Sequence, residues 1–215
     1  MSDDLAENVK ELKIILLGNS GVGKTCIINR YIHDQFNPDS ETTLGSSFST
    51  KIIKKGNIEY RLNIWDTTGQ EKYHSITKLF IKGSSAVILV YSINSLTSFE
   101  GLNSWYESIK EHLQGNEYIL VVIGSKSDLI QEEVVSEEDG KKFADERDAI
   151  FKFVSSKEDP DGINNLFNTI LEELIKKKIV KANDTVVIKN KKQKKKEETL
   201  LGNHLFSFIK RLSNI

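Results

Sequence analysis

The sequence contains a single cysteine, Cys26, among 215 residues, and it lacks any segment typical of export or membrane insertion. One cysteine excludes a framework of intrachain disulfides and favours a reducing compartment. The first ten residues, MSDDLAENVK, are acidic and polar, so they do not form the apolar core of a secretory signal. No apolar run approaches the roughly 18 residues that a membrane-spanning helix needs. We therefore expect a cytoplasmic protein with one α/β domain and an additional segment.

The net charge of −1 conceals an uneven distribution of charge along the chain. Residues 181–215 contain nine Lys and Arg but three Asp and Glu, a balance of +6, so the rest of the chain carries −7. An acidic body argues against nucleic-acid binding, and we expect no nucleic-acid partner. The basic segment is expected to contact something anionic or to act as a solvated spacer.

The composition divides the chain into an N-terminal extension (1–9), a globular domain (10–180), a basic linker (181–199) and a C-terminal segment (200–215). Six lysines between positions 189 and 196, with no apolar face, predict a disordered linker. Residues 200–215 have an amphipathic helical pattern, and two interpretations of it stay open: contact with a membrane surface, or packing on the domain or a partner. The apolar face of this pattern consists of Leu201, Leu205, Phe208, Leu212 and Ile215, with Lys210 and Arg211 on the other side.

Apolar runs and helical patterns alternate through the globular part. Strands are predicted at 12–17, 48–55, 59–66, 86–91, 119–124 and 150–154, and helices at 25–34, 97–113, 137–147 and 160–178. The two alternating runs joined by KKGN, residues 54–57, predict a hairpin. This order indicates an α/β fold: a six-stranded, mostly parallel sheet with helices on both faces. Ligands of such sheets bind beyond the carboxyl ends of the strands.

The motif GNSGVGKT, residues 18–25, follows the first predicted strand and opens the first predicted helix. Its glycines let backbone N–H groups surround an anion at the N-terminus of a helix. Lys24 is expected to contact the β- and γ-phosphates of a nucleotide, and the hydroxyl of Thr25 to bind Mg²⁺. A glycine-rich turn with an incidental lysine is the alternative, but it does not explain the strand before and the helix after.

A second motif, WDTTGQE at residues 65–71, ends the third predicted strand. Asp66 at a strand's carboxyl end can reach a phosphate-bound metal through water. The backbone N–H of Gly69 can approach a γ-phosphate closely, and Gln70 can orient an attacking water. Alone, this motif is equally consistent with a turn that carries an incidental acid.

These two motifs, together with SSK at residues 155–157, resemble those of the small GTPases of the Ras superfamily in order and spacing. The resemblance covers roughly residues 10–178 and is greatest to the Rab family, because of TLGSSF at 43–48 and the tryptophan before Asp66. It implies a P-loop NTPase fold, binding of GTP or GDP with Mg²⁺, GTP hydrolysis, and a role in vesicle traffic. It also implies a location in the cytoplasm, peripheral on the cytosolic face of endomembranes.

The resemblance also assigns residues to roles. Thr43 would join the Mg²⁺ shell when GTP is bound, and Phe36 would pack against guanine. Phe48, Trp65 and Phe80 match the aromatic triad that, with the switch loops, contacts a GTPase-activating protein, an exchange factor and effectors. The alternative for the three aromatics is core packing.

Rab proteins usually end in prenylated cysteines. No cysteine follows Cys26, so we expect no such modification at the C-terminus.

The base-recognition motif departs from the family pattern, since N-K-x-D is replaced by SKSD at residues 125–128. Asp128 can accept hydrogen bonds from N1–H and the exocyclic amine of guanine, which adenine cannot offer. Ser125 replaces an amide that bonds the base side and braces the phosphate loop. We expect guanine specificity with affinity weakened by about 1–3 kcal/mol and faster release, unless water or a backbone shift compensates. Ser156 in place of alanine is expected to matter little.

The expected reaction is in-line attack of water on the γ-phosphate, catalysed by Gln70, Lys24 and Thr43, with Thr25, Thr43 and Asp66 around the metal. No internal arginine finger is evident, because Ser20 in the phosphate loop is uncharged, so hydrolysis should be slow without a partner. A nucleotide-binding interaction module with little hydrolysis is the alternative function. The expected nucleotide-binding residues are Gly18, Asn19, Ser20, Gly21, Val22, Gly23, Lys24, Thr25, Cys26, Phe36, Thr43, Asp66, Gly69, Ser125, Lys126, Asp128, Ser155, Ser156 and Lys157.

Overall fold

The computed structural model describes residues 8–38, 43, 46–69 and 80–179. The chain divides into two units, 1–182 and 183–215, and all described residues lie in the first. The strands are β1 (Asn8–Leu17), β2 (Ser47–Lys55), β3 (Ile58–Asp66), β4 (Ala86–Ser92), β5 (Ile119–Ser125) and β6 (Ile150–Val154). The helices are α1 (Lys24–His33), α3 (Leu96–Glu100), α4 (Leu102–Leu113), the 3₁₀ helix η2 (Ser127–Glu132), α5 (Glu137–Asp145) and α6 (Pro160–Lys176).

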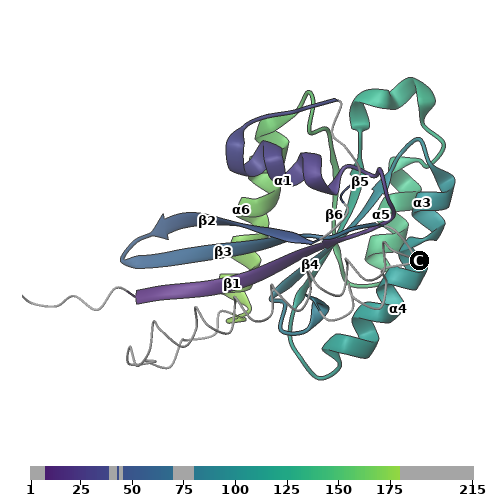
Figure 1. The fold of residues 1–215 in the computed structure, drawn as a ribbon. Coiled ribbons are helices and arrows are strands. Elements are labelled where there is room, and N and C mark those ends of the chain that lie inside the picture. Colours follow the sequence, from purple (N-terminus) through teal and green to yellow (C-terminus); the bar gives the residue numbers. More distant parts are fainter. Residues whose placement is uncertain (1–7, 39–42, 44–45, 70–79, 180–215) are drawn as a thin grey trace, which may run out of the picture. The chain divides into compact units, whose positions relative to one another are not determined.

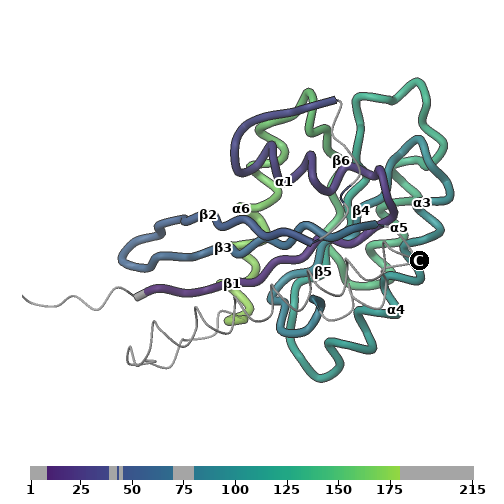
Figure 2. Tube along the Cα trace, in the orientation of Figure 1, coloured from purple at the N-terminus to yellow at the C-terminus, as the bar shows by residue number. Residues whose placement is uncertain are grey.

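The six strands form one sheet in the order β2-β3-β1-β4-β5-β6 (Figure 1). β2 runs antiparallel to β3, and the other neighbouring strands run parallel. β2 and β3 form a long hairpin at one edge of the sheet (Figure 2). β4 and β5 are interior strands of the sheet, with a neighbour on each side. This arrangement confirms the predicted fold class. The chain leaves β1 toward one edge and returns through β4 toward the other, so the crevice between β1 and β4 is the expected ligand position.

Helices cover both faces of the sheet, and the side chains of β1 alternate between the two resulting cores (Figure 1). Leu12, Ile14 and Leu16 face α1 and α6. Ile15 and Leu17 face the layer that contains α4 and α5. Alternation along a strand places successive side chains on opposite faces, so a strand buried on both faces is apolar throughout. The central strands β4 and β5 are buried at every position, as their sequences predict.

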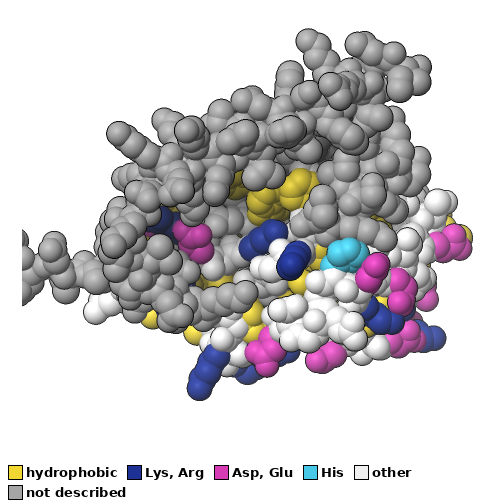
Figure 3. Space-filling model, turned by 60° about the horizontal axis from the view of Figure 1, so that its bottom comes forward, with side chains coloured by type: hydrophobic (Ala, Val, Ile, Leu, Met, Phe, Trp, Pro, Cys, Tyr) yellow, Lys and Arg dark blue, Asp and Glu magenta, His cyan; other side chains and the backbone are white. Residues whose placement is uncertain are grey.

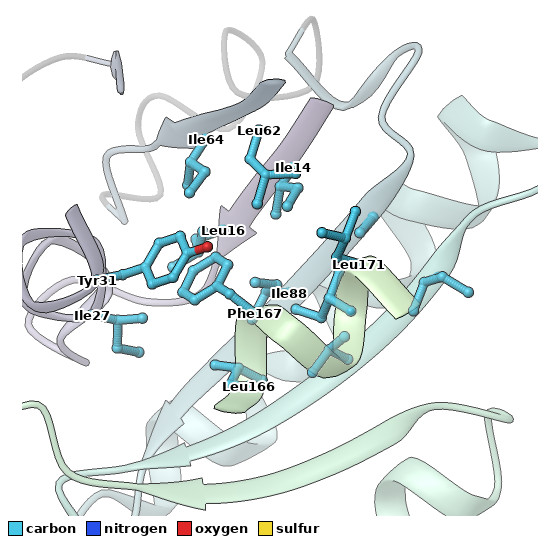
Figure 4. Packing of buried hydrophobic residues seen from close by; sticks show 14 of the residues in the cluster. Ile14, Leu16, Ile27, Tyr31, Leu62, Ile64, Ile88, Leu166, Phe167 and Leu171 are labelled. Carbon is cyan, nitrogen blue, oxygen red and sulfur yellow. The ribbon is translucent and has the colours of Figure 1, made fainter. Parts of the chain in front are cut away.

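The core between α1, α6 and the sheet contains a pair of stacked rings (Figure 4). The rings of Tyr31 and Phe167 lie 3.8 Å apart at 11°. Lys51 of β2 places its Nζ atom 3.9 Å from the Tyr31 ring centre on the side of the hairpin. Burial raises the pKa of Tyr31 to about 12. These contacts attach the β2–β3 hairpin to the helical layer beneath it.

Most boundaries agree with the sequence prediction to within two residues, and three larger differences stand out. β1 begins at Asn8 rather than at residue 12, because polar residues at its start pair with β3 from Ile58 onward. The predicted helix 97–113 is interrupted at Gly101 and forms α3 and α4. The 3₁₀ helix η2 was not predicted, since six residues with few apolar positions give no periodic signal.

The described part of the surface carries both signs of charge. On the face shown in Figure 3, the described acidic and basic side chains are interspersed rather than gathered by sign. Within the described ranges, none of the helices combines the length and the apolar composition needed to cross a bilayer.

Candidate functional site

A cavity of about 450 Å³ opens at the carboxyl ends of the strands. Its walls come from segments that are far apart in sequence, as the fold class predicts. Among the predicted nucleotide-binding residues, five do not line the cavity, although each of them contacts a residue that does: Gly18, Asn19, Val22, Asp66 and Ser155. The predicted residues that do line it are Ser20, Gly21, Gly23, Lys24, Thr25, Cys26, Phe36, Thr43, Gly69, Ser125, Lys126, Asp128, Ser156 and Lys157.

The phosphate-loop end of the cavity meets the N-terminus of α1. The helices α3, α5 and α6 each have an N-cap side chain, from Ser95, Ser136 and Asp159. No side chain caps α1, which follows Gly23. The first N–H groups of a helix have no partner within the helix, so an uncapped end can bind an anion. The local geometry of α1 therefore suits a phosphate better than that of the other three helices.

Lys24, the first residue of α1, lies inside the loop with only 5% of its surface exposed. Its Nζ atom donates to the carbonyl oxygens of Gly18 and Asn19, both at 2.8 Å. Burial lowers the pKa of Lys24 to about 8, although the nearby Asp66 carboxylate favours the charged form. The ammonium group thus has neutral acceptors that a phosphate oxygen, which is a stronger acceptor, can replace.

Three oxygen-bearing side chains meet beside Lys24. Thr25 Oγ1 donates to Asp66 Oδ2 at 2.7 Å, and Thr43 Oγ1 lies 2.8 Å from Thr25 Oγ1. Because the single proton of Thr25 goes to Asp66, Thr43 is the donor in the second contact. The other carboxylate oxygen, Asp66 Oδ1, is buried and has no hydrogen-bond partner. Burial raises the pKa of Asp66, against the opposing effects of the Thr25 hydrogen bond and Lys24.

This donor set fits Mg²⁺. Hard oxygen ligands suit Mg²⁺, which usually keeps several waters and binds through one or two carboxylates together with substrate phosphates. The described residues contain no group of three or more His, Cys, Asp and Glu side chains placed to hold a metal without such help. The hydroxyl oxygens of Thr25 and Thr43 can serve as metal ligands. The unpartnered Asp66 Oδ1 can accept a hydrogen bond from a metal-bound water.

Gly69 lies directly against the phosphate loop. A Cβ added at Gly69 would lie 2.3 Å from the carbonyl carbon of Asn19 and 2.4 Å from the backbone nitrogen of Ser20. Only a glycine permits this approach, which brings the backbone of the second motif to the phosphate end of the cavity. Gln70, the next residue, lies outside the described residues.

The base-recognition end of the cavity is held by a short chain of hydrogen bonds. Ser155 Oγ donates to Asp128 Oδ1 at 2.6 Å and accepts from the backbone N–H groups of Lys157 and Glu158 at 3.1 and 3.0 Å. The Nζ atom of Lys157 lies 4.0 Å from Asp128 Oδ2. The Asp128 carboxylate is therefore oriented before any ligand is present.

Ser125 connects the two ends of the cavity. Its Oγ atom lies 2.6 Å from the carbonyl oxygen of Val22 in the phosphate loop and 2.7 Å from that of Tyr91 at the end of β4. The brace to the phosphate loop therefore persists with serine. A hydroxyl has one proton, so Ser125 cannot satisfy both carbonyls fully and also donate to a bound base. The expected loss of affinity remains a prediction about the base side.

The three predicted partner-binding aromatics form a row outside the cavity. The ring centres of Phe48 and Trp65 lie 5.3 Å apart, and those of Trp65 and Phe80 lie 5.0 Å apart. Phe48 is 59% exposed, and the other two are half-buried. Lys13 places its Nζ atom 5.1 Å from the Trp65 ring centre. Core packing therefore describes Trp65 and Phe80 in part, but not Phe48.

Some residues of the cavity were missed in the sequence. Asn37, Pro38, Thr67 and Leu129 also line it, next to residues that were predicted. Thr67 lies within the second motif and donates to the carbonyl of Leu16 at 2.6 Å, which joins the ends of β3 and β1. Arg30 donates to the carbonyl of Ser156 at 2.8 Å and so fixes the base loop from α1. No local pattern signals that contact, because 126 positions separate the two residues.

The comparisons with known proteins agree with this geometry. The model of the Ras family matches residues 13–176. Ras-related protein Rab-17 of Homo sapiens is 37% identical over 165 residues, which are 77% of this chain and 77% of that protein. Ras-related protein Rab-22A of Homo sapiens is 38% identical over 159 residues (74% and 81%), and Ras-related protein SEC4 of Saccharomyces cerevisiae is 37% identical over 168 (78% and 76%). The chain therefore belongs to the Ras family and is a Rab-like small GTPase.

Proposed function

We propose that this chain is a switch that binds GTP, hydrolyses it slowly without a partner, and regulates the traffic of intracellular membranes through the loops around its γ-phosphate. Its family already makes it a GTPase with a general role in vesicle traffic. The proposal concerns the rate, the residues and the regulation. The observation that supports it best is the contact of Thr25 with both Thr43 and Asp66 beside the uncapped start of α1.

At the phosphate end, the β- and γ-phosphates of GTP would replace the carbonyls of Gly18 and Asn19 as partners of Lys24. The N–H groups at the start of α1 would donate to phosphate oxygens. Thr25 and Thr43 would hold Mg²⁺ directly and Asp66 would hold it through water. When bound, Mg²⁺ offsets the negative charge that develops on the phosphates during transfer.

Hydrolysis needs a positioned water. Gln70 follows Gly69, whose backbone touches the phosphate loop, and we assign to Gln70 the orientation of the attacking water. Ser20 lines the phosphate end of the cavity but carries no charge. The intrinsic rate is therefore low, and an arginine from a GTPase-activating protein would raise it by about 10³–10⁵-fold.

The output of the switch is the state of two loops. With the γ-phosphate present, Thr43 and Gly69 hold the loops on either side of the β2–β3 hairpin, and both loops relax after hydrolysis. Phe48, Trp65 and Phe80 lie on this hairpin and just beyond it, where an exposed aromatic suits a protein interface. This surface is the proposed contact for exchange factors and effectors.

Base specificity rests on Asp128. Its carboxylate would accept from N1–H and the exocyclic amine of guanine, and adenine leaves these oxygens without donors. Lys126 and Phe36 would flank the base, since both line the same cavity. Ser156 and Lys157 contribute backbone groups at the same end.

The segments beyond residue 180 lie outside the described residues. Their roles in the proposal rest on sequence alone: the basic linker contacts an anionic leaflet at about 1 kcal/mol per lysine, and residues 200–215 contact the membrane surface. The protein would then act on the cytosolic face of endomembranes.

Single-turnover hydrolysis of bound GTP tests the proposal. Wild type should hydrolyse GTP slowly, and Gln70→Leu should be slower still while binding GTP and GDP equally well. A competition assay with GDP, GTP and ATP serves as the control for correct loading. Equal rates for wild type and variant would instead favour the nucleotide-binding interaction module.

A further inference from the structure

Asn19 is a residue of the phosphate loop whose side chain points away from the phosphate end. Its Oδ1 atom accepts a hydrogen bond from the indole Nε1 of Trp105, in α4, at 3.2 Å. Trp105 is buried, with 1% of its surface exposed. A hydrogen bond between residues 86 positions apart therefore ties the phosphate loop to the second helical layer.

The same asparagine explains why a glycine stands between α3 and α4. A Cβ added at Gly101 would lie 2.7 Å from Asn19 Oδ1 and 2.9 Å from Asn19 Nδ2. The backbone of Gly101 is itself helical, with φ −60° and ψ −21°. Glycine at this position thus serves close approach rather than a special turn, at a cost in helix stability. The amide of Asn19 lies between Gly101 and Trp105.

The backbone of Asn19 contacts two groups at the phosphate end. Its carbonyl accepts from Lys24 Nζ at 2.8 Å, and its carbonyl carbon is the atom that a Cβ at Gly69 would meet at 2.3 Å. Asn19 therefore contacts three places: the lysine that we assign to the phosphates, Gly69 of the second motif, and the α3–α4 junction. No other described residue makes all three contacts.

We propose that Asn19 is a positioning residue for GTP hydrolysis, and that the α3–α4 junction, through Trp105 and Gly101, controls how Lys24 and Gly69 address the γ-phosphate. The inference rests on the proposed roles of Lys24 and Gly69. When GTP binds, Lys24 Nζ must break its hydrogen bond to the backbone carbonyl of Asn19. The rotation of this peptide group is limited because the side chain of Asn19 is held in place. The hydrogen bond to Trp105 sets this limit and transmits the change to α4.

A double-variant cycle on the full chain tests the link. Asn19→Ala and Trp105→Phe, which keeps an aromatic ring, should each lower the single-turnover rate by about 2- to 30-fold. Their combination should be no slower than the worse single variant, because both remove one interaction. Asn19→Asp keeps an acceptor for the indole and should restore the rate. Asn164→Ala, the same replacement at an exposed position of α6 away from the junction, is the matched control and should match wild type.

Gly101→Ala separates positioning from stability. Alanine favours the helix, but its methyl group displaces the Asn19 amide. The variant should lose hydrolysis to the same extent as Asn19→Ala while its thermal midpoint does not fall. Additive effects in the cycle, or rates equal to that of Asn164→Ala, would overturn the inference while leaving GTP hydrolysis by the wild type intact.

A second readout does not need hydrolysis. The indole N–H resonance of Trp105, identified by its absence in Trp105→Phe, should shift between the GDP form and the form with a non-hydrolysable GTP analogue. Asn19→Ala should abolish that shift. A resonance that is the same in both forms of the wild type would overturn the inference and leave the proposed function intact. A wild type that binds both nucleotides but cleaves no GTP would overturn the proposed hydrolysis and, with it, the role of Asn19 in the rate.

Discussion

The two ends of the cavity differ in how completely their polar groups are satisfied. At the base end, Asp128 is held by Ser155, and Ser155 is held by two backbone N–H groups. At the phosphate end, Asp66 Oδ1 has no partner and the start of α1 has no cap. The base end is therefore arranged in advance, and the phosphate end is completed by its ligand. Selection of the base and response to the γ-phosphate can thus be altered separately.

The largest expected effect comes from a substitution at the base end that leaves the phosphate end unchanged. Asp128→Asn exchanges an acceptor for a donor, so guanine loses its partner and xanthine, with an oxygen in place of the amine, gains one. We expect GDP affinity to fall by about 10⁴-fold and xanthosine diphosphate to become the preferred ligand. Competition binding with both nucleotides measures the inversion. A variant that still prefers GDP would show that Asp128 does not read the base.

The second largest effect is expected from a substitution at the phosphate end that leaves the base end unchanged. Asp66→Asn keeps the shape of the side chain but weakens its hold on a metal-bound water, and the Mg²⁺ affinity of the GDP complex should fall by about 10- to 100-fold. Titration of Mg²⁺ against the GDP release rate measures this change. Chelation of Mg²⁺ should accelerate release from wild type and have little further effect on the variant. Guanine selectivity should be unaffected in both proteins.

Ser125 tests the connection between the two ends. Ser125→Ala removes the hydrogen bonds to the phosphate loop and β4, and GDP release should accelerate about tenfold. Ser125→Asn supplies two amide protons in place of one hydroxyl proton, and release should slow by a similar factor. Stopped-flow measurement of a fluorescent GDP analogue gives both rates. If neither variant differs from wild type, water or backbone movement already compensates for the serine.

The smallest effect concerns pH at the phosphate end. Burial holds the pKa of Lys24 at about 8 in the nucleotide-free protein, below its usual 10.5, so the free protein releases this proton early as pH rises. Phosphates favour the charged form, and binding takes a proton up. Nucleotide affinity should therefore fall by about fourfold between pH 7 and 8.5. Conversely, the free protein gains stability from pH 8 to 10.5, where only the unfolded state keeps the proton.

The buried strands and amphipathic helices were predictable because their apolar periodicity is strong, and β6 was predicted with its bounds unchanged. That most phosphate-loop and base-loop residues line one cavity was predictable, because they belong to motifs of fixed spacing that follow the carboxyl ends of strands. The start of β1 was not, since Asn8 belongs to the strand through pairing with Ile58 rather than through burial.

Contacts between distant side chains carry no sequence signal. The glycine at position 101 looks like an ordinary weak point of a helix until the Asn19 amide is seen beside it. An arginine in an amphipathic helix is normally expected on its exposed side, yet Arg30 of α1 donates a hydrogen bond to the carbonyl of Ser156. Ser125 looked like the loss of a brace, and the structure shows that a shorter side chain still reaches Val22.

Neighbouring residues of a strand face opposite sides, and β3 ends with Trp65 followed by Asp66. Asp66, the proposed acceptor for a metal-bound water, and Trp65, the middle ring of the aromatic row, are thus separated by a single peptide unit, about 3.8 Å of chain. Asp66 is buried at the end of the strand, and Trp65 is half-buried on the opposite face, so a shift of the backbone at this peptide would displace both side chains. A backbone change at the cavity can therefore reach the outer surface of the hairpin through adjacent residues of one strand.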